Sequence, residues 1–434
     1  MLPGFEKQLS GLVDTGASKV LAAVSGGVDS MTMASLLAEI LPPERLAVAH
    51  CNFNLRGEES DGDEALVADW CRKNNLKFFL KRFSTLDYAK ENRISTEMSA
   101  RDLRYGWFRE LMDREGFDRL AIAHNLNDRA ETLFLNLLRG TGTRGLGGIR
   151  KANDRIVRPL LDYSREAIES YAREHGIPFR EDSTNRESVF SRNRIRNEVF
   201  PQFARINPSF LSTLKAEMDR FEEVESLLEG LCKAREGELY GWNAKGVFGI
   251  DLSQLKMGSH TKFWLFRLLD AYGFNGPQLD SIAASLEGQS GKRFYSGTHV
   301  AVKDRDYLMV YPIYDGSVPE IKVEIADKPA GFDPKGLPKG TLCVDAGKIS
   351  LPLRFRAPRE GDRFIPLGMK GSKLLSDFFT DLKLDVEQKA RETVAVTTAE
   401  NGEENIVAVI GRRIDERYKV EESTEKICYL SDIY

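Results

Sequence analysis

The stretch VLAAVSGGVDS, residues 20–30, runs directly into MTMASLLAEI, residues 31–40. Its first five residues form a short apolar run typical of a buried strand, and the apolar residues of the second segment recur at helical spacing. Gly26 and Gly27 separate the two patterns. A strand, a glycine turn and a helix bring backbone N–H groups and a helix N-terminus to one point, where they can hold an anion. The stretch therefore predicts a phosphate-binding turn.

The side chains of this turn suit the same ligand. Ser25 and Ser30 can add hydroxyl donors, and the glycines permit positive φ and a close approach of a phosphate. Asp29 would repel a phosphate unless a cation lay between them, so it is the candidate ligand for Mg²⁺. The turn lacks the Gly-Lys ending of the common P-loop. The alternative is a plain strand-to-helix turn, with Asp29 or Ser30 as the helix N-cap.

Strand-like and helix-like segments alternate over the first two hundred residues. Strands are expected at 20–25, 45–51, 77–83 and 119–124, and amphipathic helices near 30–41, 60–74, 98–114 and 128–139. This alternation predicts an α/β fold, a doubly wound, Rossmann-like parallel sheet. Ligands of such sheets bind beyond the carboxyl ends of the strands, where His50, Asn52 and His124 are expected. For the two histidines, the alternative is a structural role in orienting a loop.

A second informative stretch is AHNLNDRAETLFLNLLRGTGTRGL, residues 123–146. Asp128 and Glu131 are three residues apart near the start of a predicted helix, so they are neighbours on its surface. Acidic residues at this position also complement the helix dipole, which is the alternative interpretation. The strand before this helix should end close to the glycine turn, which favours one shared site. The G-x-G-x-x-G pattern at 140–145 follows a helix, so it indicates no dinucleotide site.

The rest of the chain divides into further domains. Residues 208–236 predict one long amphipathic helix, and 299–311 predict a hairpin. Proline and glycine are frequent between 315 and 345, which indicates a linker or an irregular edge. We therefore predict three domains in the 434 residues: a catalytic domain at 1–215, a mostly helical middle domain at 216–314, and a small α+β domain at 345–434.

Composition narrows the class of protein. No apolar run approaches the roughly 20 residues of a membrane helix, and the N-terminus lacks a signal-peptide pattern. The five cysteines form no C-x-x-C pair, so a reduced cytoplasm is expected. The net charge of −4 means that any contact with nucleic acid must come from local basic surfaces. Two basic runs, 139–158 and 354–373, are candidates, with solvated surface as the alternative.

The turn resembles the S-G-G-x-D-S signature of the PP-loop ATP pyrophosphatases, which cleave ATP between the α and β phosphates. Ser25, Gly26, Gly27, Asp29 and Ser30 carry the resemblance. It implies that these residues, with Val28 between them, bind ATP. It also implies that Mg²⁺ accompanies the nucleotide and that His50, Asn52 and His124 belong to the nucleotide pocket.

Further motifs resemble one branch of that family, the tRNA(Ile)-lysidine synthetases. The H-x-x-x-D-x-x-E-T block lies at 124–132, and the A-R-x-x-R-Y block at 100–105. Other matching segments follow in consistent order at 50–64, 158–185, 191–203, 361–383 and 410–420. The chain departs from the family pattern at Phe53, Asn54, Asn127 and Arg129.

The resemblance implies a two-step reaction. ATP adenylates the carbonyl oxygen of the wobble cytosine in a tRNA(Ile) with the anticodon CAU, and the ε-amine of free L-lysine then displaces AMP. Charge at the α-phosphate calls for cations, and Arg101 and Arg196 are the candidates. Because an amine with a pKa near 10.4 is only about one part in a thousand neutral, Asp128 and Glu131 are assigned to hold the ammonium and accept its proton.

The tRNA partner is assigned to basic residues. The run at 139–158 and residues 192–196 are candidates for the anticodon region, and the later domains for the tRNA body, through Arg356, Arg359, Arg363, Lys370 and Lys373. One alternative is a PP-loop tRNA thiolase, which the scattered cysteines disfavour. Another is a catalytically silent tRNA-binding protein, which the intact acidic residues disfavour. The sequence leaves the oligomeric state open, a homodimer included.

Overall fold

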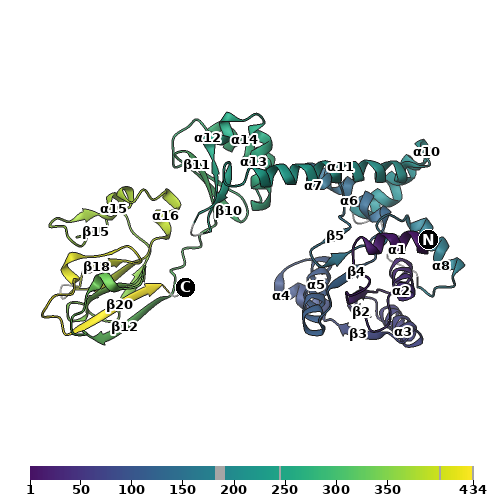
Figure 1. Cartoon of the computed structure of the whole chain (residues 1–434), viewed down its shortest axis with the longest axis horizontal. Helices are drawn as coiled ribbons and strands as arrows, with labels where there is room; N and C mark the ends of the chain where they lie inside the picture. The colour runs from purple at the N-terminus through teal and green to yellow at the C-terminus, as the bar shows by residue number, and fades with distance from the viewer. Residues whose placement is uncertain (181–190, 244–245, 400–401, 433–434) are drawn as a thin grey trace. The chain divides into compact units, whose positions relative to one another are not determined.

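The structure is a computed structural model of the chain, and it describes residues 1–180, 191–243, 246–399 and 402–432. Figure 1 shows the chain from end to end. It divides into two compact units, Met1–Leu231 and Cys232–Tyr434. In the part of the chain that the structure describes, no helix combines the length and the apolar character needed to cross a membrane.

The first unit is built on a six-stranded sheet in the order β3-β2-β1-β4-β6-β5. The neighbouring strands are parallel, except that β5 runs antiparallel to β6. From β1 the chain runs outward through β2 to β3 and then crosses back to β4 on the other side of β1, and such a switch point is where doubly wound sheets bind ligands. The strands are β1 (Val20–Ala23), β2 (Leu46–Asn52), β3 (Lys77–Arg82), β4 (Arg119–Ile122), β5 (Ala152–Asn153) and β6 (Ile156–Val157).

Helices lie on both faces of this sheet (Figure 1), because alternate residues of each strand face opposite sides. Val20 and Ala22 of β1 belong to one buried core, and Leu21 belongs to another with Phe108 and Leu111. The first core takes in α1 (Leu2–Ser10), α2 (Val28–Ile40), α3 (Glu58–Lys73) and α8 (Arg165–Glu174), and the second takes in α5 (Thr96–Glu115). The predicted parallel α/β fold is confirmed.

Most of the remaining helices of the first unit gather around α6 (Leu126–Arg139), whereas α4 (Thr85–Asn92) packs against α5. The apolar residues Leu126, Ala130 and Leu133 of α6 pack with Met218 of α11. The predicted long helix at 208–236 is α11 (Phe210–Ala234). The others are α7 (Thr143–Leu146), α9 (Ser191–Arg194), the π-helical turn η2 (Ile195–Val199) and α10 (Phe200–Ile206).

The second unit begins with an antiparallel sheet in the order β7-β8-β11-β10-β9. The predicted hairpin is formed by β10 (His299–Asp304) and β11 (Tyr307–Pro312). The other elements of this part are β7 (Tyr240–Trp242), β8 (Phe248–Asp251), α12 (Leu252–Met257), α13 (Thr261–Leu269), α14 (Gly276–Ser285) and β9 (Arg293–Tyr295).

The C-terminal part of this unit is rich in strands, in the orders β12-β20-β13, β14-β17-β18-β19 and β15-β16. The proline- and glycine-rich segment at 315–345 is more than a linker, because its strand β12 pairs along its full length with β20 near the end of the chain. The elements are β12 (Ile321–Asp327), β13 (Leu342–Asp345), β14 (Arg354–Arg356), β15 (Arg363–Phe364), β16 (Lys373–Leu374), α15 (Leu375–Asp381), α16 (Val386–Arg391), β17 (Val394–Thr398), β18 (Glu404–Val409), β19 (Arg413–Ile414) and β20 (Lys426–Asp432).

Candidate functional site

The glycine turn links β1 to α2 as expected. Gly26 has a φ of +94°, and a Cβ there would lie 3.2 Å from the Cβ of Asp63, so this position requires glycine. The backbone N–H of Ser25 donates to Ser30 Oγ at 3.1 Å, and Ser30 Oγ donates to the carbonyl oxygen of Gly27 at 2.9 Å. Gly27 is the N-cap of α2. The first N–H groups of a helix have no acceptor within the helix, so those of α2 can donate to a ligand.

Two predicted nucleotide-binding residues, His50 and Asn52, lie on β2, the strand beside β1. His50 is buried, and its Nδ1 lies 2.8 Å from the carbonyl oxygen of Val24, the residue that leads into the turn. Asn52 donates from Nδ2 to Glu64 at 2.8 Å. Neither side chain is among those that line the cavity described next. A direct contact of His50 or Asn52 with ATP therefore stays a prediction, and their present contacts are structural.

A cavity of about 580 Å³ lies at the carboxyl ends of β1 and β4, within the size range of small-molecule sites. The turn contributes Ser25, Gly27, Val28, Asp29 and Ser30 to its wall. His124 and Asp128, from the second sequence block, line the same cavity. The positively charged side chains in its wall are all arginines: Arg56, Arg104, Arg165, Arg173, Arg180 and Arg196. The structure thus brings the two sequence blocks to one site.

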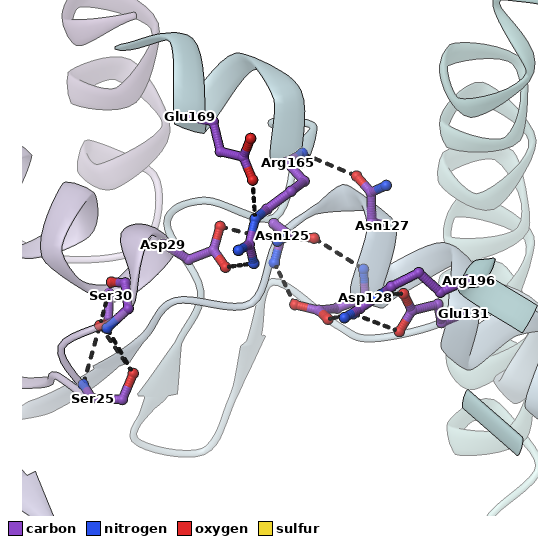
Figure 2. Close-up of polar contacts among 11 residues, drawn as sticks. Ser25, Asp29, Ser30, Asn125, Asn127, Asp128, Glu131, Arg165, Glu169 and Arg196 are labelled. Atoms are coloured by element: carbon purple, nitrogen blue, oxygen red, sulfur yellow. Dashed lines mark hydrogen bonds and ion pairs between the residues drawn. The ribbon is translucent and has the colours of Figure 1, made fainter. Parts of the chain in front are cut away.

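Asp29 is the acidic centre of the turn. Figure 2 shows its carboxylate between Arg165 and Asn125, which donate to it at 2.5 Å and 3.2 Å. Arg165 in turn donates to Glu169 at 2.8 Å. Burial raises the pKa of Asp29 to about 6, with the nearby negative charge of Asp128 acting in the same direction and Arg165 acting against it. Sequence reasoning missed Arg165, since nothing local connects it to residue 29.

The donor set around Asp29 fits a magnesium ion carried by a polyphosphate. Over the residues that the structure describes, no three His, Cys, Asp or Glu side chains are grouped as a metal cage. Mg²⁺ does not require such a cage, because it is held by one or two carboxylates while phosphates and water complete its coordination. Asp29, in the wall of an arginine-lined cavity, would be the carboxylate for such an ion.

Asp128 and Glu131 lie on the first turns of α6, as predicted. Asn125 and Asp128 form a capping box, with Asp128 Oδ2 accepting from the N–H of Asn125 at 3.1 Å. Asp128 therefore caps the helix and lines the cavity at once. Glu131 is fully buried, and burial raises its pKa. Arg196, on the π-helical turn, donates to Glu131 Oε1 at 2.6 Å and to Asp128 Oδ1 at 3.4 Å (Figure 2).

The two arginines of the A-R-x-x-R-Y block differ in position, since only one of them lines the cavity. Arg104 lines the cavity, with its guanidinium 5.1 Å from the ring of Phe53. The guanidinium of Arg101 lies 5.0 Å from the ring of Tyr105, and Arg101 is not among the cavity-lining residues. A catalytic role for Arg101 stays a prediction. The motif contained the signal for Arg104, which sequence reasoning did not select.

Two residues at which the chain departs from the family pattern, Asn127 and Arg129, form hydrogen bonds with other segments. Asn127 Oδ1 accepts from the backbone N–H of Arg165, the first residue of α8, at 3.0 Å. Arg129 is fully buried and ties α6 to two other segments. Its Nε donates to the carbonyl oxygen of Gly147 at 2.9 Å, and its Nη1 to Asp219 of α11 at 2.6 Å.

Many residues of the two basic runs predicted to bind tRNA form ion pairs with carboxylates of the same chain. In the run 139–158 these pairs are Arg144–Glu225, Arg150–Glu229, Lys151–Asp162 and Arg155–Asp113. In the run 354–373 they are Arg354–Glu404, Arg356–Asp362, Arg359–Glu404 and Lys373–Asp381. Contacts of these runs with tRNA stay predictions. Within the matching segments, residues 181–185 lie outside the described residues.

The sheet order, the glycine turn and the acidic α6 terminus at one cavity define a nucleotide-binding enzyme domain of the PP-loop class. A model of the PP-loop domain matches residues 1–203. Models of the TilS substrate binding domain and the TilS substrate C-terminal domain match residues 243–313 and 351–430. The chain belongs to the tRNA(Ile)-lysidine synthase family.

Relatives of that name match along nearly the whole chain. The chain is 37% identical to a tRNA(Ile)-lysidine synthase of Bacteroides thetaiotaomicron over 412 residues, which cover 94% of each chain. It is 35% identical to that of Parabacteroides distasonis, again over 94% of each chain. The predicted family and the predicted class, a tRNA-modifying ligase with a PP-loop ATP-binding domain, are confirmed.

A solved structure of a U34-tRNA thiolase from Methanococcus maripaludis is a more distant neighbour. It is 20% identical, with a TM-score of 0.44, and the match covers 51% of this chain and 78% of that one. So weak a likeness carries no argument for sulfur chemistry in this chain.

Proposed function

We propose that the chain ligates L-lysine to the wobble cytidine of a tRNA(Ile) with the anticodon CAU. In the first step the cytosine carbonyl oxygen attacks the α-phosphorus of ATP, and the bond to pyrophosphate breaks. In the second, the ε-amine of lysine attacks the activated ring carbon, the carbon–oxygen bond to AMP breaks, and the amine loses a proton. One observation carries the proposal: the glycine turn, an arginine-rich wall and Asp128 line one cavity.

The first step requires a held triphosphate and stabilised negative charge. The N–H groups of the turn and the hydroxyls of Ser25 and Ser30 bind phosphate oxygens. Arg196 and Arg104 stand at the same cavity and stabilise charge at the α-phosphate. A magnesium ion bound through Asp29 would supply further charge neutralisation between the phosphates.

The second step requires a neutral amine. Asp128 lines the cavity and attracts the lysine ammonium, which places the amine next to a carboxylate that can accept its proton. Glu131 stands behind it, paired with Arg196. Arg192 lies 3.5 Å from the same carboxylate, so Glu131 would act on lysine only after its pairing with both arginines is released. We infer that Arg196 serves both steps.

The tRNA must present an unstacked base. Chemistry on a base edge requires that the wobble cytidine leave the anticodon stack and enter the cavity. Arg192 and Arg194, on the helix just before Arg196, are assigned to the anticodon backbone, and the later domains to the tRNA body. Because phosphate contacts release counterions, tRNA binding should weaken steeply with salt. The enzyme would act in the cytoplasm.

The decisive experiment incubates the purified chain with a tRNA(Ile) transcript of anticodon CAU, Mg-ATP and radiolabelled lysine. Label in tRNA, with one AMP formed per lysine, is the expected result. A methionine tRNA with the same anticodon is the matched control and should stay unlabelled. Labelling that requires a sulfur donor in place of lysine would select a thiolase. Tight tRNA binding without AMP formation would select a silent binding protein.

A further inference from the structure

Two histidines lie beside the first residues of the glycine turn, one on β2 and one two residues beyond the end of β4. In the parallel register of the sheet, Ala23 of β1 lies opposite Ala49 of β2 and Ile122 of β4. His50 follows Ala49 directly, and His124 follows Ile122 by two residues. The turn therefore leaves β1 between the two imidazoles, although only His124 is among the residues that line the cavity.

Arg158 makes a contact that fixes the chemistry of His124. This arginine follows β6, the strand beside β4, and its Nε lies 3.0 Å from His124 Nδ1. A guanidinium has only donors, so the Nδ1 atom that receives this hydrogen bond must carry a lone pair rather than a proton. The neutral imidazole then holds its proton on Nε2.

The guanidinium of Arg158 is itself held in place. The Nη1 atom of the guanidinium donates to the carbonyl oxygen of Arg150 at 2.9 Å. The backbone N–H of the same residue donates to the carbonyl oxygen of Lys151 at 2.8 Å. Only 9% of the residue is exposed. Burial and the hydrogen bond at Nη1 hold the guanidinium beside His124 Nδ1, and turning it away would break that bond.

We propose that Arg158 is a positioning residue that fixes His124 as the tautomer protonated at Nε2, so that His124 presents a neutral hydrogen-bond donor to an anionic oxygen of the substrate. The substrate oxygen in question is one that gains charge in the adenylation step, so this assignment rests on the proposed function. His124 is then neither the acid nor the base of the reaction. It stabilises charge and keeps its proton.

The surroundings of His124 keep it neutral at working pH. Protonation of Nδ1 would set two N–H groups against each other and add a positive charge beside Arg158. Burial lowers the pKa of His124 to about 4; Arg158, Arg192 and Arg101 act in the same direction, and Asp128 acts against them.

His50 provides the opposite case on the other side of the turn. Its Nδ1 lies 2.8 Å from the carbonyl oxygen of Val24, and a carbonyl can only accept, so His50 is protonated at Nδ1. One histidine thus donates inward to hold the turn, and the other donates outward to the ligand. The R-P-L-L segment that begins at Arg158 gains a role by this assignment: its arginine sets the tautomer of His124.

The tautomer is tested on the full-length chain labelled with ¹⁵N-histidine, without ligands, near neutral pH. Of the five histidines, the one whose signals vanish in His124→Gln is His124. We expect an unprotonated Nδ1 and a protonated Nε2 for His124, and the reverse for His50. In Arg158→Met the His124 signals should shift toward a mixture of tautomers. Arg150→Met, which removes a neighbouring side chain paired with Glu229, should leave them unchanged.

The role of the Nε2 donor of His124 is tested by two substitutions whose amide nitrogens lie at different distances from the backbone. The amide nitrogen of Gln replaces the donor at Nε2, whereas that of Asn replaces only Nδ1. With tRNA and Mg-ATP but no lysine, we expect His124→Gln to release pyrophosphate within about tenfold of the unmodified chain, and His124→Asn to lose about 10²- to 10³-fold. Equal losses in both variants would overturn the proposed donor.

The two readouts separate the possible failures. A protonated Nδ1 or a doubly protonated His124 in the unmodified chain would overturn the inference, whether or not any variant folds. Failure of lysine transfer, with the expected tautomer and with pyrophosphate release intact, would instead count against the proposed function alone.

Discussion

The cavity at the ends of β1 and β4 and the face between α7 and α11 are both dense in charge, yet they differ in how that charge is matched. Around the cavity, six arginines meet a smaller number of carboxylates and face an open volume. Between α7 and α11, Arg144 and Arg150 pair with Glu225 and Glu229. In the wall of the first region the arginines outnumber the carboxylates, so net positive charge faces the cavity although most of these arginines also form ion pairs. The second uses its charge to hold the long helix against the catalytic domain.

This difference shows that a basic run in the sequence does not by itself indicate a phosphate-binding surface, because carboxylates elsewhere in the chain can pair with its charges. The run 139–158 holds six basic residues and one acidic residue, and as a sequence it is as good a candidate for phosphate contacts as 192–196. Two of its carboxylate partners, Glu225 and Glu229, come from α11, some eighty residues later. Four predictions test the contrast between charges that do chemistry and charges that hold structure.

The largest effect is expected on the cavity side. Asp128→Asn keeps an oxygen that caps α6 but removes the charge that attracts an ammonium and accepts its proton. Lysine transfer should fall on the order of 10³-fold. Pyrophosphate release without lysine should persist. Transfer is measured with radiolabelled lysine, and Glu217→Gln, on the exposed face of α11, is the matched control. Unchanged transfer in Asp128→Asn would remove Asp128 from the mechanism.

The next effect falls on the structural side. Arg129→Met removes a fully buried guanidinium that contacts Asp219, Glu222 and the carbonyl oxygen of Gly147, while Lys215 still pairs with Asp219. Since the two carboxylates are about one-third exposed, water can compensate in part, and the loss of stability should be about 2–3 kcal/mol. Chemical denaturation measures it. Arg150→Met, which breaks an exposed pair, should cost less than about 1 kcal/mol. Equal costs would contradict the contrast.

A pH-dependent effect distinguishes Asp29 from the paired charges of α11. Its pKa rises from 3.8 to about 6 in the folded chain. Stability contributed by the protonated form is therefore complete below about pH 4 and is lost as the pH rises through 6. Without Mg²⁺ and ATP, Asp29→Asn should stabilise the chain by roughly 1–3 kcal/mol at pH 7.5 and by almost nothing at pH 4. Denaturation at the two pH values decides. A gain that is equal at both would show that ionisation of Asp29 is not its cause.

The smallest effect concerns tRNA. Glu229→Gln frees Arg150 from an exposed ion pair, and the free arginine can then reach a phosphate. We expect tRNA affinity to rise no more than about threefold at low salt, with a salt slope steeper by at most about 1. Titrations at several salt concentrations measure both. A rise of tenfold or more would mean that the α11 carboxylates mask a real tRNA surface.

Much of the fold follows from local patterns. Residues 20–40 specify strand, turn and helix because their apolar spacing changes from an unbroken run to a period of 3.6 around two glycines. The same reasoning located α6 and placed Asp128 near its start. It missed the short strands β5 and β6, since two-residue strands have no period to detect.

The sequence by itself determined the alternation of strands and helices, the glycine turn and the acidic start of α6, because these depend on residues close together in the chain. Only the tertiary structure decided that Arg104 rather than Arg101 lines the cavity, that Glu131 is buried under Arg196, and that Arg158 sets the tautomer of His124. These pairings join residues up to 65 positions apart. Their energies depend on burial and distance, and neither quantity is written in the order of the residues.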